Sequence, residues 1–371
     1  MHLRQLNPDH AGDVEQFVRF PFALYRHCPL WVPPLLSSAR ETLNRRKHPF
    51  YHHSSADFFV VEDQGRTLGR IAALENRPYN AYRGSRTAFF GYFEVIDSLE
   101  VARLLLAAAC DWAKARGLTE IIGPRGVIGV DGTVLVEGFE YRPALGIPYN
   151  FPYYDAFIQD SGFGPDADYL SGYRSIEPRL PERFERIAER LRRRHKLRVK
   201  GFRRKAELHR WIPRLIELHH QAFGQLHSYY PPSEAELKLM IKTLFSIADP
   251  RLIQLVLKEE EIVGFLFAYP DLSRGLQKAA GRLWPWGWSH LLRERRRTNW
   301  LDISAVGLLP AYRGSGANIL LYLALHQAAR ALNYDHLEMI QIEARNANSR
   351  ADMEHLGVTW IKRHRHYRRS I

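Results

Sequence analysis

The chain has 371 residues, of which 46% are hydrophobic and 25% charged, with 25 Gly and 21 Pro. This composition excludes a collagen-like, disordered or coiled-coil chain, and the length predicts two domains because it exceeds what one hydrophobic core usually holds. Fifty-three Lys and Arg against 40 Asp and Glu give a net charge of +13. That surplus favours an anionic partner: nucleic acid, a phosphate-bearing cofactor or an anionic membrane face.

Three missing features indicate a cytoplasmic location. No run of about 18 uncharged apolar residues is present, so we expect no membrane-spanning helix. The first ten residues lack the regions of a secretion signal. Cys28 and Cys110 are the only cysteines, which is too few for a disulfide framework or a multi-cysteine metal site.

Strand and helix patterns alternate along the first half. The expected elements are strands over 58–62, 68–73 and 87–95, a helix over 98–116, a strand over 121–124 and a helix over 153–161. A charge-dense helix pattern follows over 181–194, with Phe184, Ile187 and Leu191 on one face. We interpret it as a solvated helix leading into a second domain rather than as a nucleic-acid-binding arm.

The second half repeats the first in outline. Its expected elements are a strand over 197–202, a helix over 208–223, strands over 252–257, 262–269 and 301–308, a helix over 319–332 and a strand over 336–342. The repetition predicts tandem α/β domains of similar build, over residues 1–175 and 176–371.

The sharpest local signal is a glycine loop between a strand and a helix. Arg313, Gly314, Ser315 and Gly316 follow the strand that ends near Pro310. A helix that starts after such a loop presents free N–H groups at the positive end of its dipole. Two glycines allow close approach of a bulky anion, so the loop is suited to a pyrophosphate. The P-loop, dinucleotide-binding and kinase motifs are absent from the sequence.

This loop resembles the acyl-CoA pyrophosphate loop of the GNAT (Gcn5-related N-acyltransferase) superfamily. In that pattern Gln or Arg precedes two residues, then Gly, one further residue, and Gly or Ala. Arg313 and Gly316 match, whereas Asn318 stands at the last position. The resemblance implies coenzyme A contacts from Val306, Leu308, Arg313, Gly314, Ser315, Gly316, Ala317, Asn318 and Asn346, with the strand backbone at Val306 and Leu308 pairing with the pantetheine arm.

A later GNAT motif is also recognisable, as Asn346, Ser349, Met353, Leu356 and Gly357. Many members have a Tyr at the position of Met353, and it protonates the departing thiolate. Here that role is vacant or filled by another group, for which Tyr367 and Tyr312 are candidates, and water could also serve.

The resemblance extends over nearly the whole chain to one branch, the bacterial ceramide synthase-like (YghO-like) GNAT proteins. The matching segments are 17–35, 47–50, 69–71, 89–94, 135–139, 149–154 and 357–367. One departure is 127–131, where an Asn-rich polar loop is expected. The branch implies an α/β (α+β) fold of tandem GNAT-like domains, each a mixed, mostly antiparallel sheet flanked by helices. The N-terminal domain would be degenerate and the C-terminal one the acyltransferase.

The implied function is an acyl-CoA-dependent N-acyltransferase that uses acyl-CoA or acetyl-CoA and no metal. Its acceptor would be an amine, with a lipid, sphingoid-like amine as one form. Asp302 and Glu343 are candidate general bases, and each is equally a simple strand-end carboxylate. Two alternatives stay open: a soluble N-acetyltransferase of a small amine or peptide, and a non-catalytic GNAT-fold protein that binds RNA or a membrane. Nucleic acid is not favoured, because no RNP, KH or zinc-knuckle signature is present.

Residues 272–298 form a long insertion between two expected strands. It contains Trp284, Trp286 and Trp288, and seven basic residues against one acidic residue, Glu294. Indole rings and cations favour an anionic membrane interface. The sequence therefore predicts either a helix–turn–helix at the inner face of the membrane, with Arg293, Arg295, Arg296 and Arg297 facing the lipid, or a lid packed on its own domain.

Three further features are given structural interpretations. Asp97 occupies the helix start that corresponds to the glycine loop, where it would cap the helix but repel a phosphate, so we expect that the first half binds no coenzyme A and shapes the acceptor cleft. The basic tail 363–369 is interpreted as an edge strand. The pairs His52–His53 and His219–His220 are interpreted as solvated or core histidines, so no metal site is expected.

Overall fold

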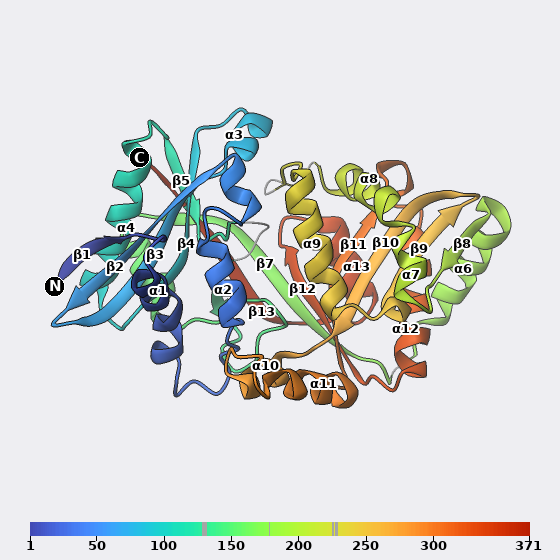
Figure 1. The fold of residues 1–371 in the computed structure, drawn as a ribbon. Coiled ribbons are helices and arrows are strands. Elements are labelled where there is room, and N and C mark those ends of the chain that lie inside the picture. Colours follow the sequence, from blue (N-terminus) through green and yellow to red (C-terminus); the bar gives the residue numbers. More distant parts are fainter. Residues whose placement is uncertain (128–131, 178, 225, 227–228) are drawn as a thin grey trace.

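The structure is a computed structural model that describes residues 1–127, 132–177, 179–224, 226 and 229–371. Most of the 127–131 segment therefore lies outside the described residues. In the described part of the chain, thirteen strands form one sheet that runs the length of the molecule (Figure 1). Along the sheet the strands are ordered β1-β2-β3-β4-β5-β13-β7-β12-β11-β10-β9-β8, and β6 pairs with β13.

The strands comprise β1 (His2–Leu6), β2 (Ser55–Asp63), β3 (Arg66–Glu75), β4 (Thr87–Val95), β5 (Glu120–Gly123), β6 (Val134–Glu137), β7 (Gly164–Ser175), β8 (Leu197–Lys200), β9 (Ile253–Lys258), β10 (Glu261–Pro270), β11 (Trp300–Leu308), β12 (His336–Glu343) and β13 (Thr359–Ser370). Their pairing is antiparallel except between β4 and β5 and between β11 and β12, which are parallel. The mixed, mostly antiparallel sheet with flanking helices expected from the sequence is confirmed.

The two halves exchange their last strands at the centre of the sheet. β7, from the first half, pairs with β12 of the second half, and β13, from the second half, pairs with β5 of the first half. The two exchanged strands also pair with each other. The C-terminus consequently lies beside α4 and β5 in the first half (Figure 1), where the amide of Ile371 donates to the carbonyl oxygen of Thr119. The boundary at 175/176 stays a prediction, since the sheet is continuous across it.

The interpretation of the basic tail as an edge strand is wrong, because β13 is a central strand with partners on both sides. Its cations are neutralised by acids on neighbouring strands. Arg365 donates to Asp168 at 2.7 Å, and Arg368 lies 2.6 Å from Glu120 and 2.9 Å from Asp166. Such cross-strand ion pairs let a strand of alternating charge lie inside a sheet.

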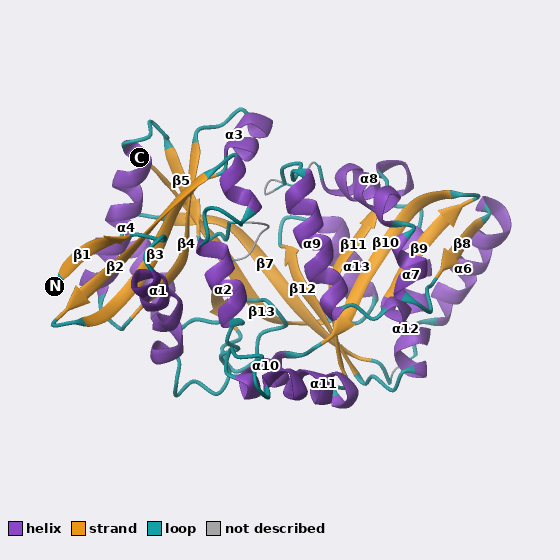
Figure 2. Cartoon of the chain, viewed as in Figure 1, coloured by secondary structure: helices purple, strands orange, loops and turns teal. Residues whose placement is uncertain are grey.

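Helices cover both faces of the sheet in each half (Figure 2). The helices of the first half are α1 (Ala11–Leu24), α2 (Leu36–Leu43), η1 (Pro49–His52), α3 (Arg77–Arg83), α4 (Leu99–Lys114) and α5 (Tyr153–Asp160). Those of the second are α6 (Glu182–His195), α7 (Lys205–His209), α8 (Ile212–Phe223), α9 (Glu234–Ile247), η2 (Pro250–Leu252), α10 (Ser273–Ala279), α11 (Gly287–Arg297), η3 (Pro310–Tyr312), α12 (Ala317–Ala331) and α13 (Ala347–His355). Each half therefore has a core on either face of its sheet.

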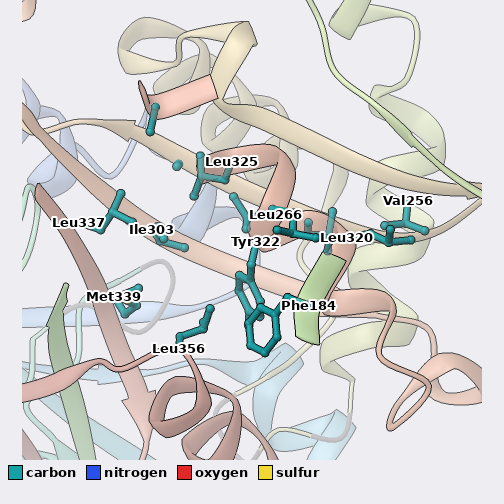
Figure 3. Close-up of a cluster of buried hydrophobic side chains, with 14 of the residues drawn as sticks. Phe184, Val256, Leu266, Ile303, Leu320, Tyr322, Leu325, Leu337, Met339 and Leu356 are labelled. Atoms are coloured by element: carbon teal, nitrogen blue, oxygen red, sulfur yellow. The ribbon is translucent and has the colours of Figure 1, made fainter. Parts of the chain in front are cut away.

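The core beneath α12 positions the glycine loop. Leu320 and Leu325 of α12 pack with Ile303 of β11 and Leu337 of β12, and Phe184 of α6 closes the cluster (Figure 3). Because α12 is fixed along this face, the glycine loop at its start is held between the end of β11, which η3 follows, and the first turn of the helix. The expected solvated helix 181–194 corresponds to α6, whose buried face joins this core while its charged face is exposed.

Two local expectations need correction. The helix expected over 208–223 is divided into α7 and α8, with Pro213 in the first turn of α8, where its missing N–H costs nothing. The cap of α4 is Ser98, whose side chain accepts from the Val101 amide, and not Asp97.

Candidate functional site

Strands β11 and β12 separate beyond their first four paired residues. Their parallel pairing joins Trp300–Ile303 with His336–Met339 and stops there, although β11 continues to Leu308 and β12 to Glu343. Over this stretch β11 remains paired with β10, after a bulge at Ser304. Val306 and Leu308 thus lie on a strand whose other edge has no strand partner in the described residues, and an extended chain could add there.

The glycine loop has the backbone that an anion site requires. Gly314 and Gly316 have φ angles of +73° and +85°, which L-residues rarely adopt. A Cβ at Gly314 would meet no atom within 4 Å, so the space in front of it is open. A Cβ at Gly316 would lie 3.2 Å from Ile187 of α6, so this glycine also allows α6 to pack closely.

Alternate amides of the loop are without acceptors. Those of Arg313, Ser315 and Ile319 donate to the carbonyl oxygens of Pro310, Tyr312 and Gly316, in ordinary turns. Among the described residues, the amides of Gly314, Gly316 and Asn318 have no hydrogen-bond acceptor. They lie at the start of α12, where the helix dipole favours negative charge, so the loop can bind a diphosphate.

The loop side chains are held to neighbouring helices. The Arg313 guanidinium donates to the Ala222 carbonyl oxygen of α8 at 2.9 Å, and the Ser315 hydroxyl donates to the Tyr312 carbonyl oxygen at 2.7 Å. Ala317 is buried. Asn318 donates to Asp352 of α13 at 2.6 Å, which explains how an Asn is accommodated where the family has a small residue.

Two residues of the later motif have structural contacts. Asn346 is the N-cap of α13, and its side-chain oxygen accepts from the Ser349 amide at 3.1 Å. Met353 is 3% exposed and belongs to the core beneath α12. The position at which many relatives have a Tyr is therefore apolar and closed here.

Asp302 is buried in a cluster of five ionisable groups between the two halves. It is 1% exposed, and its Oδ2 accepts from the Leu145 amide at 3.0 Å. Around it, Arg142 pairs with Asp271, and Lys362 lies 2.6 Å from Glu338. Burial and the neighbouring charges of Asp271 and Glu338 raise the pKa of Asp302 well above its usual value. Three carboxyl groups and two cations are electrically balanced when one acid, Asp302, is neutral.

This raised pKa predicts that Asp302 destabilises the fold as the pH rises. The folded protein keeps a proton that the unfolded chain releases above its ordinary Asp pKa of 3.8, so the stabilisation from this group is present at low pH and lost as pH rises towards the folded-state pKa. We expect the difference in Tm between Asp302→Asn and wild type to become more positive from pH 4 to pH 8. The change should be about 2–4 °C for each kcal/mol of stability that the wild type loses through Asp302 over this range. Calorimetric melting measures this, with Asp271→Asn as control, which breaks the Arg142 pair and should destabilise throughout. A Tm difference independent of pH would contradict the assignment.

Glu343 lies on the part of β12 that has separated from β11, where its Cα partner is Tyr169 of β7. Both side chains are half-buried, and Ser304 on β11 is exposed. Asp302 lies opposite Glu338 on β12. β12 has a bulge between Glu338 and Glu343, whose partners on β7 are four residues apart, so the two candidate bases are about 13 Å apart along the sheet. They cannot serve one reacting atom together, and Glu343 is the one that solvent reaches.

The two tyrosines named as substitutes for the missing acid differ in position. Tyr367 is fully buried in the first half, where its hydroxyl donates to Asp155, so it is excluded. Tyr312 is half-buried beside the glycine loop. Tyr169, which sequence reasoning missed, is adjacent to Glu343, and its hydroxyl lies 3.3 Å from His366 Nδ1. No local sequence motif identifies Tyr169, because it comes to lie beside Glu343 only through the pairing of β7 with β12.

Residues of α3, in the first half, form hydrogen bonds with the connection between α8 and α9, in the second half. Arg83 of α3 donates to the carbonyl oxygens of Leu226 and Tyr229, the latter at 3.0 Å. Tyr82 donates to the Gly224 carbonyl oxygen at 3.1 Å. Sequence reasoning missed these contacts, which join segments more than 140 residues apart.

The described residues offer neither a metal site nor a membrane span. They include no group of three or more His, Cys, Asp or Glu that could hold a metal ion. They also include no helix with the length and apolar character needed to cross a membrane.

Comparison with known proteins identifies similar sequences in the acetyltransferase family. Residues 212–358 match the acetyltransferase (GNAT) family. The chain is 26% identical over 370 residues to Protein YghO of Escherichia coli (strain K12), covering 97% of this chain and 93% of that protein. It is 25% identical over 372 residues to the bacterial ceramide synthase of Caulobacter vibrioides, covering 97% and 95%.

Solved structures share the complete fold. A tandem GNAT protein from the clavulanic acid biosynthesis pathway matches with a TM-score of 0.58 at 14% identity, covering 100% of this chain and 98% of that one. A GCN5-related N-acetyltransferase from Sphaerobacter thermophilus matches with a TM-score of 0.53 at 15% identity, covering 100% and 95%. The molecule is thus an N-acyltransferase with the tandem GNAT fold. Over nearly its whole length its sequence is similar to those of YghO and the bacterial ceramide synthase, which is the resemblance expected from the sequence.

Proposed function

We propose that this protein transfers an acyl group from a coenzyme A thioester to the amine of a lipid-like acceptor. The observation that carries the proposal is the set of free amides at Gly314, Gly316 and Asn318, next to the strand edge that β12 leaves unpaired. A diphosphate on these amides would direct the pantetheine arm along Val306 and Leu308. The thioester would then lie between the separated strands, within reach of groups near Glu343.

In the proposed reaction the amine attacks the thioester carbonyl directly. Glu343 takes a proton from the ammonium, the C–N bond forms, and the C–S bond breaks to release the coenzyme A thiolate. Backbone amides of β11 beyond Ser304 would stabilise the oxyanion. Tyr169, Tyr312 or water would return a proton to the thiolate, because Met353 cannot.

A lipid acceptor is supported by the ceramide synthase relative and by an exposed aromatic surface on the connection between α10 and α11 and on α11 itself. We therefore place the protein in the cytoplasm, peripherally on the inner face of the membrane. The test is to incubate it with palmitoyl-CoA or acetyl-CoA and with sphinganine, a polyamine or a peptide. We expect thiol release, and an amide product by mass spectrometry, with palmitoyl-CoA and sphinganine. Turnover confined to acetyl-CoA and the soluble amines would instead establish the soluble alternative.

We expect one coenzyme A per chain. In the first half α4 starts after Ile96, Asp97 and Ser98, with no glycine, and Ser98 caps it. Asp97 adds a negative charge where the second half has free amides, so a phosphate is repelled. Isothermal titration with coenzyme A measures the stoichiometry, and a value near two would contradict the proposal that this half has lost the site.

We further propose that the first half positions the acceptor site through α3. Removing the Arg83 side chain frees the α8–α9 loop, at a cost of about 1 kcal/mol for each lost hydrogen bond. Arg83→Ala should raise the KM for the amine about tenfold and leave the Kd for coenzyme A unchanged. Arg77→Ala is the matched control, since Arg77 is exposed on the same helix and, among the described residues, its side chain pairs only with Glu75, at 3.8 Å. Equal effects of the two variants would refute a positioning role.

A further inference from the structure

The insertion between β10 and β11 is a hairpin of two helices, α10 and α11, which we call the α10–α11 hairpin (residues 271–298). It lies along the lower edge of the molecule in Figure 1, below α2. Its connection presents two indoles to solvent, Trp284 at 82% exposed and Trp286 at 72%. Trp288 and Leu292 follow at 46% and 51%. Monomeric proteins rarely expose this much contiguous aromatic and aliphatic surface unless it binds a partner.

The charges of the hairpin are separated between its two faces. Both of its acids are buried: Asp271 at its base is 4% exposed and pairs with Arg142, and Glu294 is 8% exposed and packs against α10 at Gly275. Arg295 is half-buried and donates to the Ala248 carbonyl oxygen. The remaining six cations are exposed, and none forms an ion pair with a described residue: Arg274, Lys278, Arg282, Arg293, Arg296 and Arg297. The outer surface is therefore positive and apolar.

Aromatic and basic groups also share a depression beside α11. Its volume is about 350 Å³, and it is lined by Trp288, Ser289, Leu292, Arg293, Arg296 and Arg297. Three guanidinium groups around an apolar floor suit a phosphate group attached to a hydrocarbon chain.

The hairpin is fixed to both halves before it meets a partner. Gln277 donates to the carbonyl oxygens of Pro29 and Trp31 at 2.8 and 3.0 Å, and the Leu36 amide donates to the Gly281 carbonyl oxygen. At its base the Asp271 amide donates to the Trp300 carbonyl oxygen. A surface held in this way loses little conformational entropy on binding.

We infer that the α10–α11 hairpin docks this protein on an anionic lipid bilayer, with its indoles in the interface and its cations on lipid phosphates. Tryptophan prefers the interfacial region, and exposed cations attract an anionic leaflet. A bilayer accounts for both the exposed apolar side chains and the exposed cations. RNA would account for the cations and for stacking on Trp284 and Trp286, but not for the exposed aliphatic side chain of Leu292. This inference deepens the proposed function, because docking would bring a lipid amine to the enzyme, although the binding itself needs no turnover.

The test is sedimentation of the full chain with vesicles of phosphatidylcholine containing 30 mol% phosphatidylglycerol. We expect binding that weakens at least tenfold between 0.1 and 0.5 M salt, and at least tenfold in Trp284→Ser/Trp286→Ser. Arg293→Gln/Arg296→Gln/Arg297→Gln should weaken it similarly. The matched control is Arg190→Gln/Arg192→Gln/Arg194→Gln, which removes three exposed cations from α6 instead.

Several results would overturn the inference: no binding at 0.1 M salt, equal binding to pure phosphatidylcholine, or an equal loss in the α6 variant. Binding of single-stranded RNA through the same residues, without vesicle binding, would do so too. A coenzyme A-induced rise in Tm, measured on every variant, separates this inference from the proposed function. If the shift persists without vesicle binding, only docking fails; if it is absent while vesicles bind, only the enzymatic proposal fails.

Discussion

Gly314→Ala/Gly316→Ala should weaken coenzyme A binding about 100-fold. Both residues have positive φ angles, and an L-residue in that conformation costs roughly 1–2 kcal/mol. The loop would relax away from this backbone and lose the amide geometry that receives the diphosphate. Because about 1.4 kcal/mol corresponds to a tenfold change in affinity, two such positions account for the expected loss. Isothermal titration with coenzyme A measures it directly.

The matched control for this variant is Gly65→Ala, in the turn between β2 and β3. Gly65 has a φ of +76° and, like Gly314, no neighbouring atom within 4 Å of where a Cβ would lie. The substitution imposes the same backbone strain far from the loop, so it should lower the Tm and leave coenzyme A affinity unchanged. If the loop variant retains wild-type affinity, the diphosphate does not bind at these amides and the proposed function loses its main support.

Local patterns predicted the glycine loop and most strands of the second half, because these elements depend on interactions between near neighbours, but they missed α9 and the division between α7 and α8. The glycine loop is the clearest case: two glycines after an apolar strand predict free amides, and Gly314 and Gly316 have the required backbone. The hairpin was predicted in the same way, from its length and its tryptophans. The burial of Glu294 within the hairpin could not be predicted, since the sequence does not show toward which side of the helix an acidic side chain is directed.

Long-range pairing is what the sequence could not reveal. Alternating cations in β13 are typical of an exposed edge, yet Asp166 and Asp168 of β7 neutralise them across the exchanged pair. The same exchange brings Tyr169 beside Glu343. Asp302 has the spacing of a catalytic acid or base, and only the packing of the 142–145 loop shows that it is enclosed. These features depend on segments more than 150 residues apart.

Glu343→Gln should lower kcat by about 10²–10⁴-fold, the usual contribution of a general base. The amide keeps the size of the side chain but cannot accept the proton of the attacking ammonium. Coenzyme A affinity and Tm should be unchanged, because Glu343 is half-buried at the end of β12 and forms no ion pair with a described residue. The measurement is thiol release from palmitoyl-CoA at saturating sphinganine.

The variant Asp302→Asn tests whether Asp302, and not Glu343, is the general base. Asp302 is enclosed, and its Oδ2 already accepts from the Leu145 amide, a bond that an Asn oxygen can keep. This variant should therefore change kcat less than about fivefold while altering the pH dependence of Tm. A large loss of kcat in Asp302→Asn with near-normal turnover in Glu343→Gln would reverse the assignment. It would also require that the 142–145 loop open during the reaction, because a buried acid can act only on an amine that reaches it.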